Sequence, residues 1–149
     1  MATLDRGRLT LGANCLGAAK EALDISIRYA GERTAFGGPI GNLQAIQQML
    51  ADMATDIEAA RLLTFSAAEM KDRGENYTAQ ASMAKLFASE MVNRTTAKAL
   101  QMHGGYGFTR EYPVERFYRD ARVFTIYEGT SEIQRIVISN HILKDKRKP

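Results

Sequence analysis

An isolated carboxylate near the C-terminal end of the sequence is the first candidate for acid–base chemistry. Glu128 lies between Tyr127 and Gly129, directly before a predicted helix. Residue chemistry alone leaves two interpretations open. The carboxylate can complement the positive end of that helix's dipole. It can also act as a general base on a tight turn, where a glycine lets a substrate approach the backbone and leaves an amide N–H free to bind an oxygen.

A second segment with unusual chemistry interrupts the helical pattern at residues 31–41. It contains four glycines and a proline, which do not continue a helix easily. Within it, Arg33 and Phe36 place a cation and an aromatic ring three residues apart, beside Gly37 and Gly38. Residue chemistry alone favours a surface loop that carries one apolar side chain.

Histidine and cysteine provide no further constellation. His103 ends a predicted long helix, where a histidine interacts favourably with the helix C-terminus. His141 is far away in the sequence, and no histidine or cysteine has metal-ligand spacing with His103, so we exclude a metal site. Cys15 is the sole cysteine and cannot form an internal disulfide, which fits a reducing compartment. We expect it to be a small packing residue.

Three long amphipathic segments must position these candidates. Apolar and small residues recur at three and four positions in residues 5–30, 43–73 and 76–103, which predicts a helix in each segment. Asn42 is the predicted N-cap of the second helix, and Gly74 is its predicted stop. The short connection that follows predicts that the second and third helices pair antiparallel. The expected inner stripe of the first helix comprises Leu9, Gly12, Leu16, Ala19, Leu23, Ile27 and Ala30.

Two shorter helices follow in the C-terminal third of the sequence. Pro113 suits the first turn of a helix at residues 113–121. A final helix is predicted at residues 131–143, with Ser131 and Gln134 as a capping box.

No set of strands is predicted, so the expected fold class is all-α. We expect an up-and-down bundle of three long helices plus two short C-terminal helices, in a single domain that covers residues 1–149. Helices of about 30 residues are rods of roughly 45 Å. Such rods are long for one small domain, so we expect the bundle to bury further surface against other subunits or domains.

Composition excludes several classes of protein. The content of 45% hydrophobic and 25% charged residues is ordinary for a soluble globular protein. No apolar run approaches the roughly 18–20 residues that span a membrane, and the N-terminus has no apolar signal-peptide core. The net charge of +3 comes from residues 144–148, which we expect to be a solvated, frayed end. No basic face is predicted on the folded part, so we expect neither nucleic-acid nor membrane binding.

Several motifs together resemble the C-terminal helical domain of the flavin-dependent acyl-CoA dehydrogenases. Each motif alone is weak, whereas their order and spacing over the whole chain make chance agreement very improbable. The motifs are Arg33-x-x-Phe36-Gly37, Gln44, Gln101-x-x-Gly104-Gly105-x-Gly107-Phe108, Glu111-Tyr112-Pro113-Val114-Glu115, Arg119-Asp120-Ala121, and Tyr127-Glu128-Gly129-Thr130-Ser131-Glu132-Ile133-Gln134.

The resemblance implies an activity and a substrate site. Glu128 falls on the family's catalytic base, which removes the α-proton of an acyl-CoA thioester while the β-hydrogen leaves as hydride to flavin N5, giving the trans-2-enoyl-CoA. Asp5 and Arg8 match first-helix positions that contact acyl-CoA, and Tyr127 and Gly129 flank the base in the thioester region.

The resemblance also implies FAD as the cofactor. Arg33, Phe36 and Gln44 match positions that hold the FAD of a neighbouring subunit. Gln101, Gly104 and Gly105 match a stretch on the adenosine side, and Thr130 and Glu132 match flavin contacts after the catalytic turn. The implied partners are further copies of the chain, as a homotetramer or dimer of dimers, and an electron-transferring flavoprotein as electron acceptor. The implied location is the bacterial cytoplasm, with the mitochondrial matrix as the alternative.

Two features of the sequence refine these expectations. Some family members carry the base on the first helix, immediately before an arginine; here that position is Gly7, which supports the straight-chain type with Glu128 as base. The N-terminal helical domain and the middle β-domain of the family are absent from these 149 residues. We therefore expect the chain alone to bind FAD weakly and to turn over poorly. The alternatives are an oligomerisation scaffold without catalysis, and an acyl-CoA oxidase reaction on the same fold.

Overall fold

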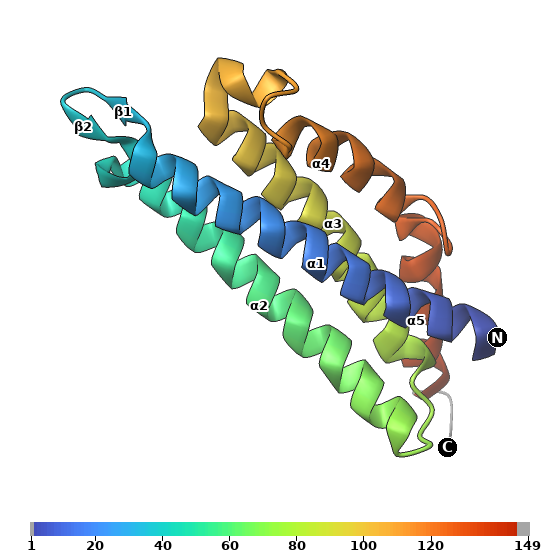
Figure 1. The fold of residues 1–149 in the computed structure, drawn as a ribbon. Coiled ribbons are helices and arrows are strands. Elements are labelled where there is room, and N and C mark those ends of the chain that lie inside the picture. The colour runs from blue at the N-terminus through green and yellow to red at the C-terminus, as the bar shows by residue number, and fades with distance from the viewer. Residues whose placement is uncertain (1, 146–149) are drawn as a thin grey trace.

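The fold was obtained as a computed structural model, which describes residues 2–145. It is an all-α bundle, as the sequence predicts (Figure 1). The five α-helices are α1 (Ala2–Glu32), α2 (Gln44–Asp72), α3 (Thr78–His103), α4 (Val114–Ala121) and α5 (Ser131–Asp145). In the part of the chain described, no helix is both long enough and apolar enough to cross a membrane.

The three long helices alternate in direction, so α1 and α3 run parallel with α2 opposed to both. Across α2 and α3, Asp56 pairs with Arg94 at 3.0 Å and Asp52 pairs with Lys98 at 2.7 Å, so position numbers rise on one helix as they fall on the other. Between α1 and α3, contacts keep a near-constant offset of 73 to 74 residues from one end to the other. The predicted antiparallel pairing of the second and third helices is therefore confirmed.

Helix α3 is the centre of the bundle, because it packs against α1, α2, α4 and α5. Small residues let its neighbours approach closely: Ala81, Ala84 and Ala88 are fully buried. Buried hydroxyl groups on α3 bond to the helix itself, as where the Thr96 hydroxyl donates to the carbonyl of Val92 at 2.8 Å. Hydroxyl groups can therefore face the interior from α3 while they bond to its own backbone.

The inner face of α1 differs from the predicted stripe. Ala19 and Ala30 are buried as expected, but Ile27 is 51% exposed. The buried positions next to it are Ala22 and Ser26, where the Ser26 hydroxyl donates to the carbonyl of Ala22 at 2.7 Å. A hydroxyl that is satisfied within its own helix can replace an apolar side chain at the interface, which a hydrophobic repeat does not register. Cys15 is fully buried among α1, α2 and α3 neighbours, so its predicted packing role is confirmed.

The break between α1 and α2 is more ordered than the loop we predicted. Strands β1 (Thr34–Ala35) and β2 (Gly38–Pro39) form a two-stranded antiparallel hairpin, and a 3-10 turn follows as η1 (Ile40–Asn42). The two hairpin-turn residues, Phe36 and Gly37, have φ values of +53° and +92°. Two positive φ values are what a tight two-residue hairpin requires. This two-stranded sheet has only four residues and adds no layer to the bundle, so the all-α fold class is confirmed.

Two predicted helix caps are wrong. Asn42 belongs to η1, and the residue that precedes α2 is Leu43, which caps no amide with its side chain. The chain enters α2 from a 3-10 turn rather than from a loop, so no side-chain cap is used. Ser131 and Gln134 form no capping box, because both side chains bind elsewhere, as described below.

The remaining C-terminal segments complete the course of the chain. After α3 comes the 3-10 segment η2 (Gly104–Phe108), and a further 3-10 segment, η3 (Arg122–Thr125), follows α4. Pro113 directly precedes α4 rather than lying in its first turn. The predicted frayed tail at residues 144–148 begins inside α5, which continues to Asp145, and residues 146–148 lie outside the described residues.

Candidate active site

Glu128 lies on a tight turn between η3 and α5, in a backbone conformation that is unusual for its type. Its φ is +56°, and Gly129 follows with φ +90°. The left-handed region costs a residue with a Cβ about 1–2 kcal/mol, so the surrounding structure must hold the turn in place. Such held conformations occur often at functional sites.

The Glu128 carboxylate lies directly over Gly7 of α1. A Cβ placed on Gly7 would stand 2.5 Å from Oε2 and 2.9 Å from Oε1 of Glu128. Any side chain at this position would therefore collide with the carboxylate. Residues 7 and 128, the two positions at which the resemblance implies a base, thus face each other here, and the glycine leaves the space to Glu128.

Two side chains that the sequence analysis missed hold the carbonyl groups of this turn. Lys85 of α3 donates from Nζ to the carbonyl oxygen of Gly129 at 2.8 Å. Gln134 of α5 donates from Nε2 to the same oxygen at 2.9 Å and to the carbonyl of Glu128 at 3.1 Å. Both Lys85 and Gln134 are fully buried. The signal available in the sequence was a lysine between Ala84 and Ala88, on the predicted inner face of α3.

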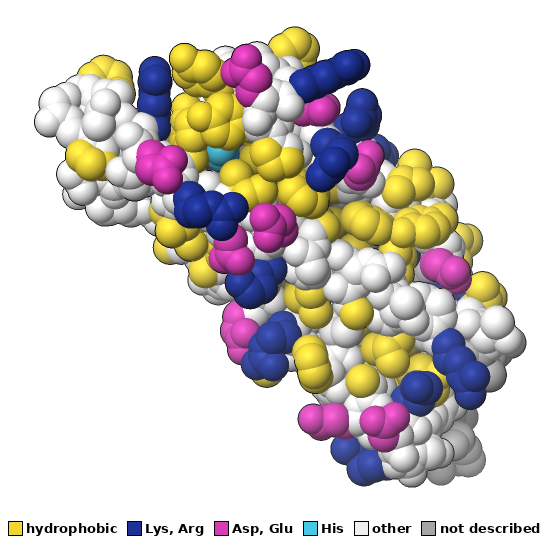
Figure 2. Space-filling model, in the orientation of Figure 1, with side chains coloured by type: hydrophobic (Ala, Val, Ile, Leu, Met, Phe, Trp, Pro, Cys, Tyr) yellow, Lys and Arg dark blue, Asp and Glu magenta, His cyan; other side chains and the backbone are white. Residues whose placement is uncertain are grey.

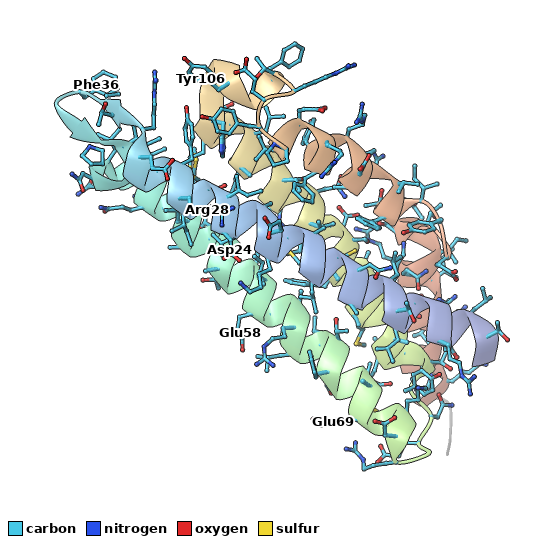
Figure 3. All side chains as sticks on the ribbon, in the orientation of Figure 1. Asp24, Arg28, Phe36, Glu58, Glu69 and Tyr106 are labelled. Carbon is cyan, nitrogen blue, oxygen red and sulfur yellow. The ribbon has the colours of Figure 1, made fainter. Side chains whose placement is uncertain are left out.

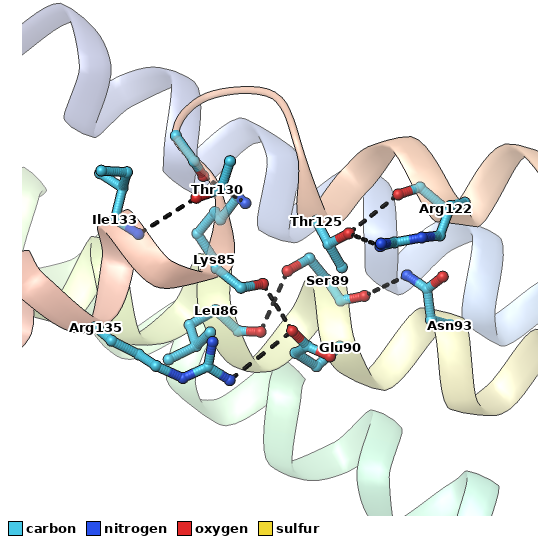
Figure 4. Close-up of polar contacts among 12 residues, drawn as sticks. Lys85, Leu86, Ser89, Glu90, Asn93, Arg122, Thr125, Thr130, Ile133 and Arg135 are labelled. Atoms are coloured by element: carbon cyan, nitrogen blue, oxygen red, sulfur yellow. Dashed lines mark hydrogen bonds and ion pairs between the residues drawn. The ribbon is translucent and has the colours of Figure 1, made fainter.

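The start of α5 is fixed by a second set of polar contacts (Figure 4). The Thr130 hydroxyl accepts from the amide of Ile133 at 3.4 Å. The Ser131 hydroxyl donates to Glu90 of α3 at 2.7 Å, and Arg135 pairs with Glu90 at 3.9 Å. Glu132 is exposed in the first turn of α5, where hydrogen bonds to the backbone and to Thr130 lower its pKa. Thr130 and Glu132, two predicted flavin contacts, therefore lie beside Glu128.

The predicted substrate residues Asp5 and Arg8 flank Gly7 but point into the α1–α3 interface. Each is only 3% exposed, and Arg8 Nη1 lies 2.9 Å from Asp5 Oδ1. The pair also bonds to α3: Arg8 donates to the Ser82 hydroxyl at 3.3 Å, and the Thr78 hydroxyl donates to Asp5 at 2.8 Å. In this structure their polar atoms serve the helix interface that supports the turn.

Tyr127 is the more open neighbour of the base. It is 41% exposed and stacks on Phe124 with ring centroids 5.9 Å apart. Partial burial raises the pKa of its phenol. We call this region the base end of the bundle, comprising Gly7, Lys85, Tyr127–Thr130 and Gln134.

The other predicted cofactor residues gather at the opposite end of α1, which we call the aromatic end. It comprises Tyr29, Arg33, Phe36, Gln101–Tyr106 and Tyr112, with Gln44 exposed near the start of α2. Figure 3 shows Phe36 at the tip of the hairpin and Tyr106 at the same end of the bundle. Phe36 is 93% exposed. Figure 2 shows hydrophobic side chains gathered on the surface beside the hairpin.

A cleft of about 430 Å³ opens at the aromatic end. Its lining includes Arg33, whose guanidinium carbon lies 5.4 Å from the ring centre of Tyr106. A Cβ placed on Gly104 or Gly105 would meet no other atom within 4 Å, so the backbone there is open to a close-lying group. A cation, an open glycine backbone and an exposed ring together suit an anion joined to a flat ring system.

His103 lies under this cleft and does not act as a charged helix cap. It is 2% exposed, stacks on Tyr29 with centroids 4.0 Å apart, and bonds through Nδ1 to the carbonyl of Ala99 at 2.8 Å. Burial lowers its pKa below the ordinary 6.5, and this outweighs the opposite effect of the Ala99 bond. The neutral form is therefore favoured, and the expected favourable interaction with the helix C-terminus is made by the neutral ring through its bond to Ala99.

The structure thus divides the predicted cofactor residues into two groups. The span from Gly7 to Glu32 along α1 is about 38 Å, at about 1.5 Å per residue. Among the described residues, no group of three or more His, Cys, Asp or Glu side chains is arranged to hold a metal ion.

Known proteins are similar to this chain over nearly its whole length. A family model described as "Acyl-CoA dehydrogenase, C-terminal domain" matches residues 1–143. The CarC subunit of the caffeyl-CoA reductase–Etf complex of Acetobacterium woodii is 56% identical over 144 residues, which is 97% of this chain and 38% of the relative. The mitochondrial short-chain specific acyl-CoA dehydrogenase of Bos taurus is 53% identical over 147 residues, covering 99% and 36%.

A solved structure is also similar over nearly the whole of this chain. The butyryl-CoA dehydrogenase of Megasphaera elsdenii superimposes with a TM-score of 0.94 at 45% identity, over 96% of this chain and 37% of that one. The chain therefore spans little more than a third of the length of these three relatives. By the family match, the identities and the shared fold, this chain belongs to the acyl-CoA dehydrogenase family and corresponds to its C-terminal domain.

Proposed function

We propose that this chain supplies the catalytic base of an FAD-dependent acyl-CoA dehydrogenase. The observation that carries the proposal is the Glu128 carboxylate, held on a left-handed turn over a glycine that leaves it room. The carboxylate removes a proton from the α-carbon of an acyl-CoA thioester, while the β-hydrogen leaves as hydride. Loss of one proton and one hydride gives the trans-2-enoyl-CoA and leaves Glu128 protonated.

The chain's own residues act by holding and shielding the base. Gln134 fixes both turn carbonyls, so the carboxylate needs little reorganisation when it takes the proton. The half-exposed Tyr127 borders the space over the base, and Gly129 allows the thioester to approach the backbone. The flavin supplies the hydride acceptor when bound.

We propose that each FAD site is built from two copies of the chain. The base end and the aromatic end of one copy are about 38 Å apart along α1. One dinucleotide, whose halves are joined by a single diphosphate, is too short to reach both. Thr130 and Glu132 of one copy then lie near the flavin ring, while Arg33, Phe36, Gln44, Gln101, Gly104 and Gly105 of a neighbouring copy hold the diphosphate and adenosine. This supports a homotetramer or dimer of dimers.

The relatives' names bear on the electron carrier and the direction of reaction. CarC is named as a subunit of a reductase–Etf complex. We propose an electron-transferring flavoprotein as the partner of the complete enzyme, located in the bacterial cytoplasm or, alternatively, the mitochondrial matrix. By microscopic reversibility, a protonated Glu128 returns the proton to the α-carbon in the reductive direction.

The test adds FAD to the purified chain, removes free flavin, and records the visible flavin spectrum before and after anaerobic addition of acyl-CoAs of several lengths. We expect weak flavin retention by the chain alone. Where flavin is retained, or where the remainder of the flavoenzyme is supplied, we expect bleaching by an acyl-CoA that is lost in Glu128→Gln. Bleaching that persists in Glu128→Gln contradicts the assignment of the base. A stable flavin-free tetramer that never bleaches would favour the scaffold alternative, and rapid reoxidation by oxygen would favour the oxidase.

A further inference from the structure

Lys85 is a buried cation to which neither the sequence motifs nor the proposed reaction assigns a role. It lies near the middle of α3 and is 0% exposed. Burying an ammonium group costs free energy unless the group is well bonded. Burial also lowers the pKa of Lys85. A lysine placed in such a position therefore calls for an explanation in terms of what its ammonium group contacts.

The ammonium group of Lys85 is not half of an ion pair in the described part of the chain. No carboxylate lies within 4.0 Å of its Nζ among the salt bridges there, whereas the neighbouring Asp5 and Arg8 pair with each other. The thiol of nearby Cys15 is not a counter-ion either, because burial raises its pKa to about 12 and keeps it neutral. The partner that the structure gives to Lys85 is the carbonyl of Gly129, 44 residues away and next to the base.

We propose that Lys85 is a positioning residue for the base, which fixes the Gly129 carbonyl and thereby the turn that presents Glu128 over Gly7. This inference rests on the proposed role of Glu128. The Gly129 oxygen accepts from both Lys85 and Gln134, so both of its lone pairs are used. The donors come from α3 and α5, so the turn is tied to two helices.

The turn needs this restraint because its backbone does not rest in an ordinary energy well. Glu128 at φ +56° is disfavoured by its own Cβ, and Gly129 directly after it also has a positive φ of +90°, so the turn persists only while its neighbours hold it. A bond from a charged donor to that carbonyl is stronger than one from a neutral donor. Lys85 therefore anchors the turn at the residue that directly follows Glu128.

The experiment compares Lys85→Met with the control Lys98→Met. The methionine keeps the length and apolar character of the buried stem but has no donor, so we expect it to fold. Lys98 lies on the same helix, pairs with Asp52 and is 28% exposed. Amide hydrogen exchange is measured on the chain, and kcat, KM and the isotope effect of α-deuterated acyl-CoA are measured on the FAD-loaded flavoenzyme.

For Lys85→Met we expect amide exchange at residues 127–131 to quicken about tenfold or more, with exchange across α1 and α2 unchanged. We expect kcat to fall roughly 100-fold at nearly constant KM, as for a misplaced catalytic group, with a larger α-deuterium isotope effect. Lys85→Gln, which keeps a shorter donor, should lie between Lys85→Met and the parent. Lys98→Met should match the parent.

Unchanged exchange and kcat in Lys85→Met would overturn the proposal. Uniformly faster exchange in all helices, with KM and kcat reduced alike, would overturn it as well, since Lys85 would then serve general stability. Failure of the underlying function gives a different result. In that case Glu128→Gln would remain active, while the exchange measurement would still report whether Lys85 holds the turn.

Discussion

The two ends of α1 differ in whether their functional groups are bonded within the chain or exposed. At the base end, polar side chains bond within the chain: Lys85 and Gln134 bond to the turn, and beside it Asp5 pairs with Arg8. At the aromatic end, Phe36 is 93% exposed and the glycines after α3 face open space. The base end holds its carboxylate in position with side chains of the same chain, whereas the aromatic end exposes side chains and backbone to a partner. The comparison supports our proposals that the base is positioned by its own chain and that the cofactor site is completed by another copy.

The largest effect should follow from removing the base itself. Glu128→Gln keeps the size of the side chain and its backbone bonds but cannot take a proton. We expect kcat for acyl-CoA dehydrogenation to fall by roughly 10²–10⁴-fold, with FAD binding and thermal unfolding unchanged. Stopped-flow measurement of flavin reduction checks this. A fall of less than about threefold would mean that another group takes the proton.

A methyl group on Gly7 tests whether the base end is as closely fitted as its geometry indicates. The new Cβ would stand 2.5 Å from Oε2 of Glu128, so the carboxylate must move. We expect Gly7→Ala to lower kcat by roughly 100-fold. The matched control is Gly17→Ala on the same helix, where a Cβ meets nothing within 4 Å; it should leave kcat unchanged and stabilise the helix by about 0.5–1 kcal/mol. Equal kcat values in the two variants would contradict the fit.

The aromatic end should respond in the opposite way, losing binding without losing stability. Phe36 makes few contacts in its own chain, so Phe36→Ala should change the free energy of unfolding by no more than about 0.5 kcal/mol. In the assembled flavoenzyme we expect FAD affinity to weaken by about tenfold or more, the effect of losing a ring–ring stack. Flavin fluorescence titration measures this, with Phe65→Ala, another exposed phenylalanine, as control. FAD affinity equal to the parent's would remove Phe36 from the cofactor site.

The smallest effect concerns the pH dependence of stability at the aromatic end. Because burial lowers the pKa of His103 below 6.5, the unfolded chain binds its proton at a higher pH than the folded one. The contribution of His103 to the free energy of unfolding should therefore be constant above about pH 6.5. It should decrease as the pH drops below that value. In urea unfolding, His103→Gln should lose less free energy of unfolding at acid pH than the parent, whereas His141→Gln should lose as much. If the free energy of unfolding depends on pH in the same way in the parent and both variants, other groups cause the loss.

The helices were predictable from the sequence because their pattern is local. Residues recurring at three and four positions predicted the three long helices to within a few residues, and Gly74 ended the second as predicted. Terminal signals such as Pro113 placed the two short helices. The hairpin was missed because each strand has only two residues, too few for an alternating pattern. The caps failed for a related reason: Ser131 finds Glu90 across the bundle, and no local rule anticipates that partner.

The site was predictable in part and for different reasons. The resemblance placed Glu128 and its neighbours on one turn, and the structure brings Gly7 under that turn. Lys85 and Gln134 could not be found in this way, because their roles depend on contacts between separate helices. A lysine on an inner face is a weak signal by itself, since a long stem often carries its charge out to water. Only packing decides that Lys85 stays inside.

The length of α1 has a consequence for mixtures of defective chains. Because one copy's base end and aromatic end serve different FAD sites under the proposed assembly, each site inherits its two halves from different polypeptides. A chain with Glu128→Gln and a chain with Phe36→Ala are each defective alone. In a mixed oligomer, one arrangement unites the intact Glu128 of one chain with the intact Phe36 of the other and restores a working site. Two damaged alleles of this protein would thus complement each other in one cell, because Gly7 and Glu32 lie about 38 Å apart along one helix.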